Sequence, residues 1–193
     1  EAAFNSLVIA LSASLISTVL GTMAGLAMHR YRLRLLPVLV LTPIAIPEIL
    51  MGVALLIFFV LLNFTLGLVS VALAHIAFCI GFVAIVVRSR LAGGLVVEIG
   101  FNAPVQAFWH VTLPLIMPGV IAGALMAFTL SIDDFVITFF TAGAGTVTLP
   151  LQIYSMIKIA VTPEVNAVST LLMLLTLALI IIASRLSPSL LNT

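Results

Sequence analysis

Long apolar stretches recur along the chain, and short segments between them hold most of the charged residues. The hydrocarbon core of a bilayer is about 30 Å thick, so a helix that crosses it needs about 20 mainly apolar residues. Five stretches are long enough, at about residues 4–28, 35–62, 66–87, 115–140 and 165–183. The mean hydropathy of +1.43 excludes an ordinary soluble domain. The sequence therefore predicts an all-α, polytopic membrane protein with one transmembrane domain over residues 1–193.

Several small or polar residues within these stretches predict local features of the helices. Gly21 and Gly25 form a small-xxx-small pair, which permits close helix approach. Prolines interrupt the second stretch, and Pro47 is the last of them. Cys79 lies in an apolar run and is expected to be a small core residue. His75 is expected to be a satisfied donor between helices rather than a ligand.

The distribution of arginine and lysine fixes the expected orientation, because basic residues concentrate in cytoplasmic loops. With five spans, six of the 7 basic residues fall on one side. The N-terminus is then outside and the C-terminus cytoplasmic. An external N-terminus without a signal sequence indicates that a first helix is missing. The six residues are Arg30, Arg32, Arg34, Arg88, Arg90 and Arg185.

The external segment 142–163 is not expected to span the membrane. Gly143 and Gly145 break the helix, and apolar residues at helical spacing then predict a short interfacial helix over 151–161. Thr162 is expected to cap the next helix, which begins with Pro163.

Acidic residues near the spans are the strongest candidates for a substrate pathway. Acids at a span are costly and usually face protein or water. Asp133 and Asp134 either end the fourth span at the interface, or they form a cation-attracting lining or a docking contact, in which case one of them should face inward. Glu48 is either a buried group bonded to backbone freed by prolines or a pathway carboxylate. Glu164 fits a helix N-terminus or the same pathway.

Aromatic and amide side chains near the outer side complete the pathway hypothesis. Tyr154 and nearby phenylalanines could pack around a cation, although aromatic residues at helical spacing also serve as packing or interface anchors. Asn166 could bond a substrate or a neighbouring helix.

No catalytic constellation is visible in the sequence. There is no nucleophile–base pair, no zinc-binding motif and no glycine-rich phosphate loop. The three histidines are far apart, so no metal site is expected, and a net charge of +1 gives no basic surface for nucleic acid. If transport is active, ATP must be used by a partner.

The cytoplasmic loop at about residues 88–114 contains a polar, aromatic, proline-punctuated segment. Gln106 to Val111 is expected to form a short helix with Phe108, Trp109 and Val111 as apolar knobs and His110 between them. Pro114 and Pro118 are expected to turn the chain sharply into the fourth span. The alternative is an interfacial aromatic anchor.

This loop resembles the coupling loop of binding-protein-dependent ABC importer permeases. Val111-Thr112-Leu113-Pro114 matches the end of the family signature. The first half departs from it, because Glu98-Ile99-Gly100 stands where Glu-Ala-Ala is usual. Either the loop is reduced or residues near 94–103 are missing. The resemblance implies that Gln106, Phe108, Trp109, His110, Val111, Leu113 and Pro114, with Glu98 and Gly100, contact an ATPase subunit.

Further segments are similar to the spermidine/putrescine branch, in particular its second (C-type) permease subunit. They are His29–Arg32, Ser131–Phe135, Ile153–Lys158 and Thr162–Ala167. The resemblance implies a family core of six helices with the first missing here, in a bacterial inner membrane. It also implies a heterodimer with a second permease, two ATPase subunits that hold ATP and Mg, and an external substrate-binding protein. No cofactor is expected on this chain itself.

Other functions remain open at this point. Related importers of phosphonates, ferric iron or opines share parts of these segments. A channel or secondary transporter would need coupling groups in midspan or an internal repeat, and no repeat is visible. An intramembrane enzyme is disfavoured by the absent catalytic pair.

Overall fold

The computed structural model describes residues 1–31, 35–91 and 108–159, together with 163, 166, 167, 169–171, 173, 174 and 177. The described residues form helices and connecting turns, without a strand, which confirms the all-α prediction. They fall into two compact units, residues 1–151 and 152–193. The elements in chain order are α1 (Ala2–Arg30), α2 (Leu35–Ala45), α3 (Glu48–Leu61), α4 (Leu68–Arg90), the π-helical turn η2 (Phe108–Thr112), α6 (Leu113–Asp133), α7 (Val136–Thr141) and α8 (Leu149–Ile159).

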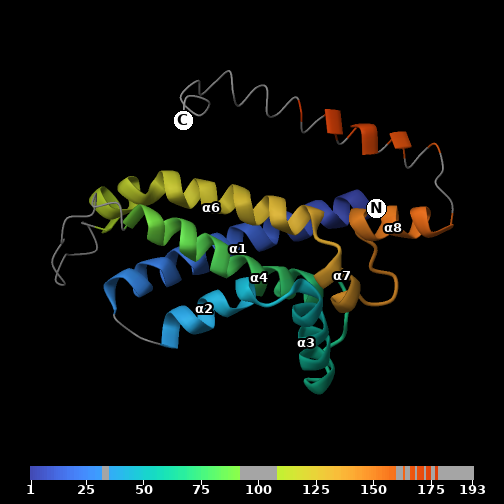
Figure 1. Ribbon diagram of the computed structural model, residues 1–193, viewed down its shortest axis with the longest axis horizontal. Coiled ribbons are helices and arrows are strands. Elements are labelled where there is room, and N and C mark those ends of the chain that lie inside the picture. The colour runs from blue at the N-terminus through green and yellow to red at the C-terminus, as the bar shows by residue number, and fades with distance from the viewer. Residues whose placement is uncertain are drawn as a thin grey trace. The chain divides into compact units, whose positions relative to one another are not determined.

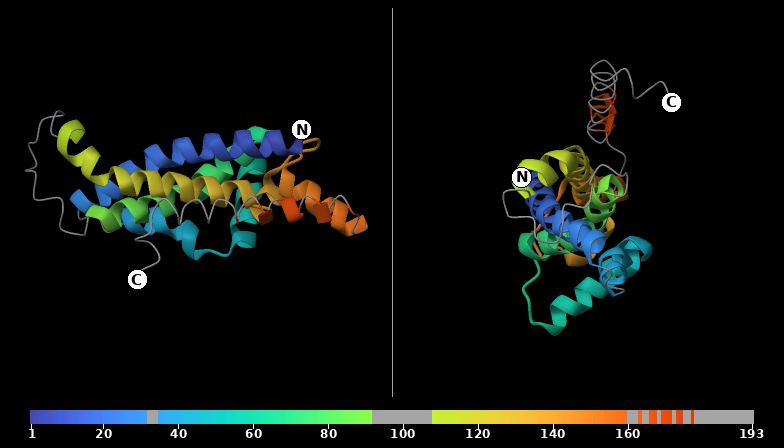
Figure 2. Two further views of the ribbon diagram at one scale, coloured as in Figure 1. Left: turned by 90° about the horizontal axis from the view of Figure 1, so that it is seen from above. Right: turned by 90° about the vertical axis from the view of Figure 1, so that its left-hand side faces the viewer.

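Three long helices, α1, α4 and α6, lie side by side and form the body of the first unit (Figure 1, Figure 2). Each is long and apolar enough to cross a membrane, and the candidate span that contains α6 also includes η2. Helix α1 runs in the same direction as α4, since Gly21 faces Val83 and Gly25 faces Val87. Helix α6 runs the opposite way, because Gly119 near its start lies against Arg90.

This arrangement separates the charged residues of the first unit into two ends. We call the end with Arg30, Arg88, Arg90 and η2 the arginine-bearing end. The opposite end, where α6 stops at Asp133 and Asp134, is the acid-bearing end.

The predicted close approach at Gly21 and Gly25 is confirmed. A Cβ atom at Gly21 would lie 2.6 Å from the Cβ of Val83 and 2.8 Å from the carbonyl oxygen of Ile80. At Gly25 it would lie 2.9 Å from the carbonyl oxygen of Ala84. Small residues at these positions allow the two helices to approach closely in lipid, where hydrophobic burial drives little association.

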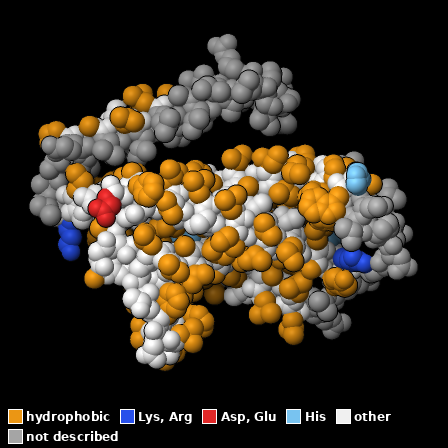
Figure 3. Space-filling model, turned by 180° about the vertical axis from the view of Figure 1, so that it is seen from behind, with side chains coloured by type: hydrophobic (Ala, Val, Ile, Leu, Met, Phe, Trp, Pro, Cys, Tyr) orange, Lys and Arg blue, Asp and Glu red, His pale blue; other side chains and the backbone are white. Residues whose placement is uncertain are grey.

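The core of the first unit lies between α3, α4, α6 and α7. Cys79 is fully buried in it, as predicted, and the same core contains Val83, Ile116 and Ile137. The outer surface is also apolar: hydrophobic side chains cover most of the described face in Figure 3, and charged ones are few. A surface of this kind suits contact with lipid.

The second predicted span is a bent pair of helices rather than one rod. Helices α2 and α3 meet at 111° across Ile46 and Pro47. Proline has no N–H to donate and pushes the preceding residue out of the helical region, so the break falls at Pro47. Glu48 opens α3 and is exposed, so the alternative in which it is a buried group is wrong.

The fourth predicted span ends earlier than its hydropathy indicates. Helix α6 stops at Asp133, and the apolar residues that follow form the separate six-residue helix α7. At its other end, η2 passes into α6 without an intervening loop, so Pro114 and Pro118 both lie within continuous helix. Pro114 lies in the first turn of α6, where proline is tolerated, whereas Pro118 lies inside the helix.

The short helix expected over 151–161 is present as α8, which begins at Leu149, two residues before its predicted start. The cap predicted at Thr162 lies outside the described residues, as does most of the fifth predicted span.

Candidate functional site

A cluster of four polar side chains lies buried at the acid-bearing end. His75 of α4 is 2% exposed, and its Nδ1 is 2.7 Å from the Oγ of Ser131 on α6. Its Nε2 is 2.9 Å from the Oγ1 of Thr138 on α7 and 3.2 Å from the Oδ2 of Asp134. We call these four residues the His75 cluster. The prediction that His75 is a satisfied residue between helices is confirmed.

The hydrogen bonds of the cluster assign the proton on one ring nitrogen of His75. Thr138 has a single hydroxyl proton and donates it to Asp134 Oδ2 at 2.9 Å. Its oxygen can therefore only accept from His75, so Nε2 is the donor. Nδ1 faces the hydroxyl of Ser131, which can donate to it or accept from it.

Asp134 holds the first turn of α7 in place. Its carboxylate accepts the backbone N–H of Ile137 at 3.3 Å and of Thr138 at 2.8 Å. A carboxylate that caps the exposed amides of a helix start also complements the helix dipole. The side chain of Asp134 is 5% exposed, so this acid faces the protein interior.

Asp133 differs from its neighbour in the chain because it is exposed. The expectation that one of the two acids faces inward is thus met, with Asp134 inside and Asp133 outside. An exposed carboxylate beside an apolar bundle is available to attract a cation. Two acids that are adjacent in sequence therefore occupy two different environments.

Further hydrogen bonds join the connecting segments at the acid-bearing end. Ser70 at the start of α4 donates to the carbonyl oxygen of Thr141 at 2.8 Å. Asn5 Nδ2 donates to the carbonyl oxygen of Val147 at 2.9 Å, and Ser6 Oγ accepts the N–H of Leu149 at 2.8 Å. Both ends of the segment between α7 and α8 are therefore fixed to other helices.

The arginine-bearing end presents apolar side chains outward. Trp109 is 58% exposed and Val111 is 49% exposed, both on η2. Phe108 packs edge-on against Trp109 with ring centroids 5.6 Å apart. His110 and Pro114 are also exposed, and Leu113 is half-buried. The predicted knobs thus stand on one short helical turn.

The remaining predicted pathway residues are not brought together in one place. Glu48 opens α3, whereas Tyr154 belongs to the second unit and is 45% exposed. Asn166 is exposed, and its carbonyl oxygen accepts the hydroxyl of Thr170. Glu164, Gln106, Glu98 and Gly100 lie outside the described residues. The roles predicted for all these residues stay predictions.

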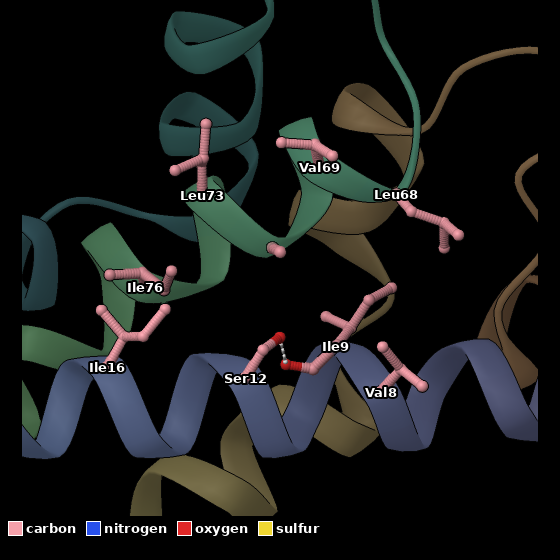
Figure 4. A pocket seen from close by; sticks show the side chains of 9 residues that line it. Val8, Ile9, Ser12, Ile16, Leu68, Val69, Leu73 and Ile76 are labelled. Atoms are coloured by element: carbon pink, nitrogen blue, oxygen red, sulfur yellow. Dashed lines mark hydrogen bonds between the residues drawn. The ribbon is translucent and has the colours of Figure 1, made fainter.

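A surface groove of about 280 Å³ lies between α1 and α4. Figure 4 shows its lining of aliphatic side chains, and the hydroxyl of Ser12 is directed to the carbonyl oxygen of Ile9. The groove offers no charged group to a cation. Within the described ranges, no group of three or more His, Cys, Asp or Glu residues could hold a metal ion.

The bundle, its apolar surface and its two chemically different ends define a helical integral membrane protein. Comparison with known proteins agrees. Residues 103–192 match the family described as the binding-protein-dependent transport system inner membrane component. The chain is 40% identical over 189 residues to the spermidine/putrescine transport system permease protein PotC of Escherichia coli (strain K12), covering 94% of this chain and 72% of that protein.

Two further relatives widen the comparison. The putrescine transport system permease protein PotI of Escherichia coli (strain K12) is 36% identical over 184 residues, which cover 87% of this chain and 65% of that protein. The molybdenum transport system permease protein ModB of Mycobacterium bovis is 29% identical over 196 residues, which cover 90% of this chain and 74% of that protein. The chain belongs to the family of binding-protein-dependent transport system inner membrane components. These relatives are named as permease proteins, which places the chain among transport subunits.

Proposed function

We propose that this chain is a permease subunit of an ATP-driven importer of polyamines, such as spermidine or putrescine. It forms half of the translocation pathway with a second permease, receives substrate from an external binding protein and is driven by two ATPase subunits. The main observation in favour of a cationic substrate is the exposed carboxylate of Asp133 at the acid-bearing end. The names of two relatives support the same substrate class.

The orientation in this proposal follows from the separation of charge. Arg30, Arg88 and Arg90 gather at one end of the bundle, and basic residues favour the cytoplasm. The acid-bearing end is then outside, where substrate arrives, and the C-terminus is cytoplasmic. An exposed acid near a low-dielectric wall raises the local concentration of cations and repels anions. The relative named for molybdenum is therefore a weaker guide to the substrate.

The aromatic turn η2 supports the proposed contact with an ATPase. Trp109 and Val111 are turned away from the bundle, and a rigid helical turn can lie in a groove of a partner. Because η2 passes directly into α6, movement of the ATPase would reach α6 and the acid-bearing end through one helix. ATP and Mg would be held by the ATPase alone.

Uptake by the assembled complex tests the proposal. The chain is expressed with an ATPase, a second permease and a binding protein of a polyamine importer, in cells without other polyamine uptake. We expect uptake of labelled spermidine or putrescine, and about tenfold less with Asp133→Asn, equivalent to about 1.4 kcal/mol. Asp133→Glu, which keeps the charge, is the matched control.

Molybdate and phosphonate are offered to the same cells as competing substrates. Uptake of either, with no uptake of polyamines, would contradict the proposal and support an importer for another small solute. Polyamine uptake that is indifferent to Asp133→Asn would remove the physical argument for Asp133.

A further inference from the structure

Within the junction between α6 and α7, the carboxylate of Asp134 caps the first turn of α7, but this contact does not fix the direction of α7 relative to α6. Helix α6 ends at Asp133, and Asp134 has extended dihedral angles of φ −64° and ψ 126°. Helix α7 has six residues, and so short a helix is not stable by itself in isolation. Contacts from outside the junction must therefore fix its direction.

His75 supplies such a contact from a different helix. Its Nε2–H meets Thr138 Oγ1 and Asp134 Oδ2, and both groups belong to the first turn of α7 or its cap. Its Nδ1 meets Ser131 in the last turn of α6. One imidazole ring thus bonds to the residues on both sides of the junction.

The other face of α7 packs closely against α3. A Cβ atom at Gly52 would lie 2.7 Å from the Cδ2 of Phe140, and Ile137, Thr138 and Thr141 are buried. Helix α7 is therefore held between α3 and the His75 cluster. A shift at His75 has to change the path of the chain at Asp134 and with it the position of Asp133.

We propose that His75 is a positioning residue for uptake: by bonding Asp134, Thr138 and Ser131 it fixes the α6–α7 junction and so sets where the exposed carboxylate of Asp133 stands. His75 itself does not touch the substrate, because it is buried. The part of this inference that concerns uptake rests on the proposed function.

Two substitutions separate the two sides of the ring. His75→Gln keeps an N–H near the position of Nε2 and so preserves the bonds to Asp134 and Thr138. His75→Asn is shorter; it keeps a polar group near Nδ1 and loses those bonds. His75→Leu fills a similar space without a hydrogen-bonding group, so it should behave like His75→Asn if the bonds matter and like His75→Gln if His75 only fills the space.

The first readout is the dependence of polyamine uptake on substrate concentration in the complete complex. We expect His75→Asn to raise KM about three- to tenfold, the effect of losing one net hydrogen bond, with normal amounts of protein in the membrane. His75→Gln should keep KM within about twofold of the unchanged chain on the same scale. Asp133→Asn should raise KM as well, and combining it with His75→Asn should add little, since both act on one carboxylate.

The second readout does not depend on the substrate. Asp133→Cys is labelled with a membrane-impermeant maleimide in three complexes: one that keeps His75, one with His75→Asn and one with His75→Gln. The native Cys79 is fully buried and gives a low background. We expect His75→Asn, but not His75→Gln, to change the labelling rate. Thr65→Cys, in the exposed loop before α4, is the control that should not respond.

The outcomes distinguish this inference from the proposed function. A changed labelling rate without any polyamine uptake by the unchanged chain would support the positioning role and contradict the substrate. Equal labelling rates and equal KM in His75→Asn would overturn the inference, as would equal effects of the two substitutions. If His75→Asn does not accumulate, Thr138→Val keeps the shape of the cluster and removes one partner, and an unchanged labelling rate there would overturn it too.

Discussion

The two ends of the bundle differ in which side chains face inward and which face outward. At the acid-bearing end, polar side chains turn inward and satisfy one another, as Asp134 does with His75 and Thr138. At the arginine-bearing end, the aromatic side chain of Trp109 turns outward from η2. In most soluble proteins the polar groups would be outside and the aromatic ones inside. The polar groups of the first end are thus satisfied within the chain, whereas the exposed aromatic side chain of the second end is the surface on which we propose that an ATPase binds.

The His75 cluster explains why the acid-bearing end can carry a carboxylate inside a membrane protein. A buried charge is tolerated when it is paired and hydrogen-bonded. Asp134 has two backbone N–H donors, one hydroxyl donor and the imidazole of His75. Asp133 has a different environment because it is exposed, and it is therefore the acid that remains available to a ligand.

The largest effect is expected from breaking the cluster. Asp134→Ala leaves the N–H groups of α7 and the ring of His75 without their acceptor, which should lower the free energy of unfolding by about 1–3 kcal/mol for each buried donor left unpaired. Thermal unfolding of the detergent-solubilised protein measures this loss. Asp133→Ala, the exposed neighbour, should change the midpoint little. Equal destabilisation by both substitutions would remove the distinction between the two acids.

A smaller effect, confined to assembly, is expected at the other end. Trp109→Ala should weaken binding of the ATPase by about 2 kcal/mol, or about 30-fold, because exposed aromatic anchors dominate interfaces. Titration of the purified permease complex with the ATPase measures the Kd. Phe58→Ala removes another exposed aromatic ring, 53% exposed on α3, and should leave the Kd unchanged. If both variants bind the ATPase normally, η2 is not its contact.

The connection between the two ends depends on close packing of α1 and α4. Gly21→Ala places a methyl group 2.6 Å from Val83 and 2.8 Å from a backbone oxygen, which should cost about 1–2 kcal/mol. Gly67→Ala is a suitable control, since its Cβ would meet only Thr146 Oγ1 at 3.8 Å. Thermal unfolding should separate the two variants. No difference between them would mean that α1 and α4 move apart without cost.

Hydropathy predicted the long helices well because a membrane span leaves a long, uniform signal. Helix α1 was expected over 4–28 and extends over Ala2–Arg30. The break at Pro47 was also predictable, because proline has a defined local effect. The end of α6 was missed, since the apolar residues Val136–Phe140 continue the hydropathic run beyond Asp134. An aspartate just before an apolar run is a common helix cap, so Asp134 could have indicated the start of a new helix.

The His75 cluster could be predicted only in part. A buried histidine in a span must find partners, and this much follows from the residue type. Its partners Ser131 and Thr138 are 56 and 63 residues away, so only the packing of α4 against α6 and α7 brings them together. The exposure of Trp109 was predicted from its loop, but the π-helical form of η2 has no evident signal in the sequence.

The orientation of the two ends is the claim on which the whole account depends. Thr65→Cys at the acid-bearing end and Ser89→Cys beside Arg90 at the arginine-bearing end are both exposed positions. In intact cells, a membrane-impermeant maleimide should label Thr65→Cys at once and Ser89→Cys only after the membrane is permeabilised. Labelling of Ser89→Cys in intact cells, with Thr65→Cys protected until permeabilisation, would place the acids in the cytoplasm and contradict the proposed direction of transport.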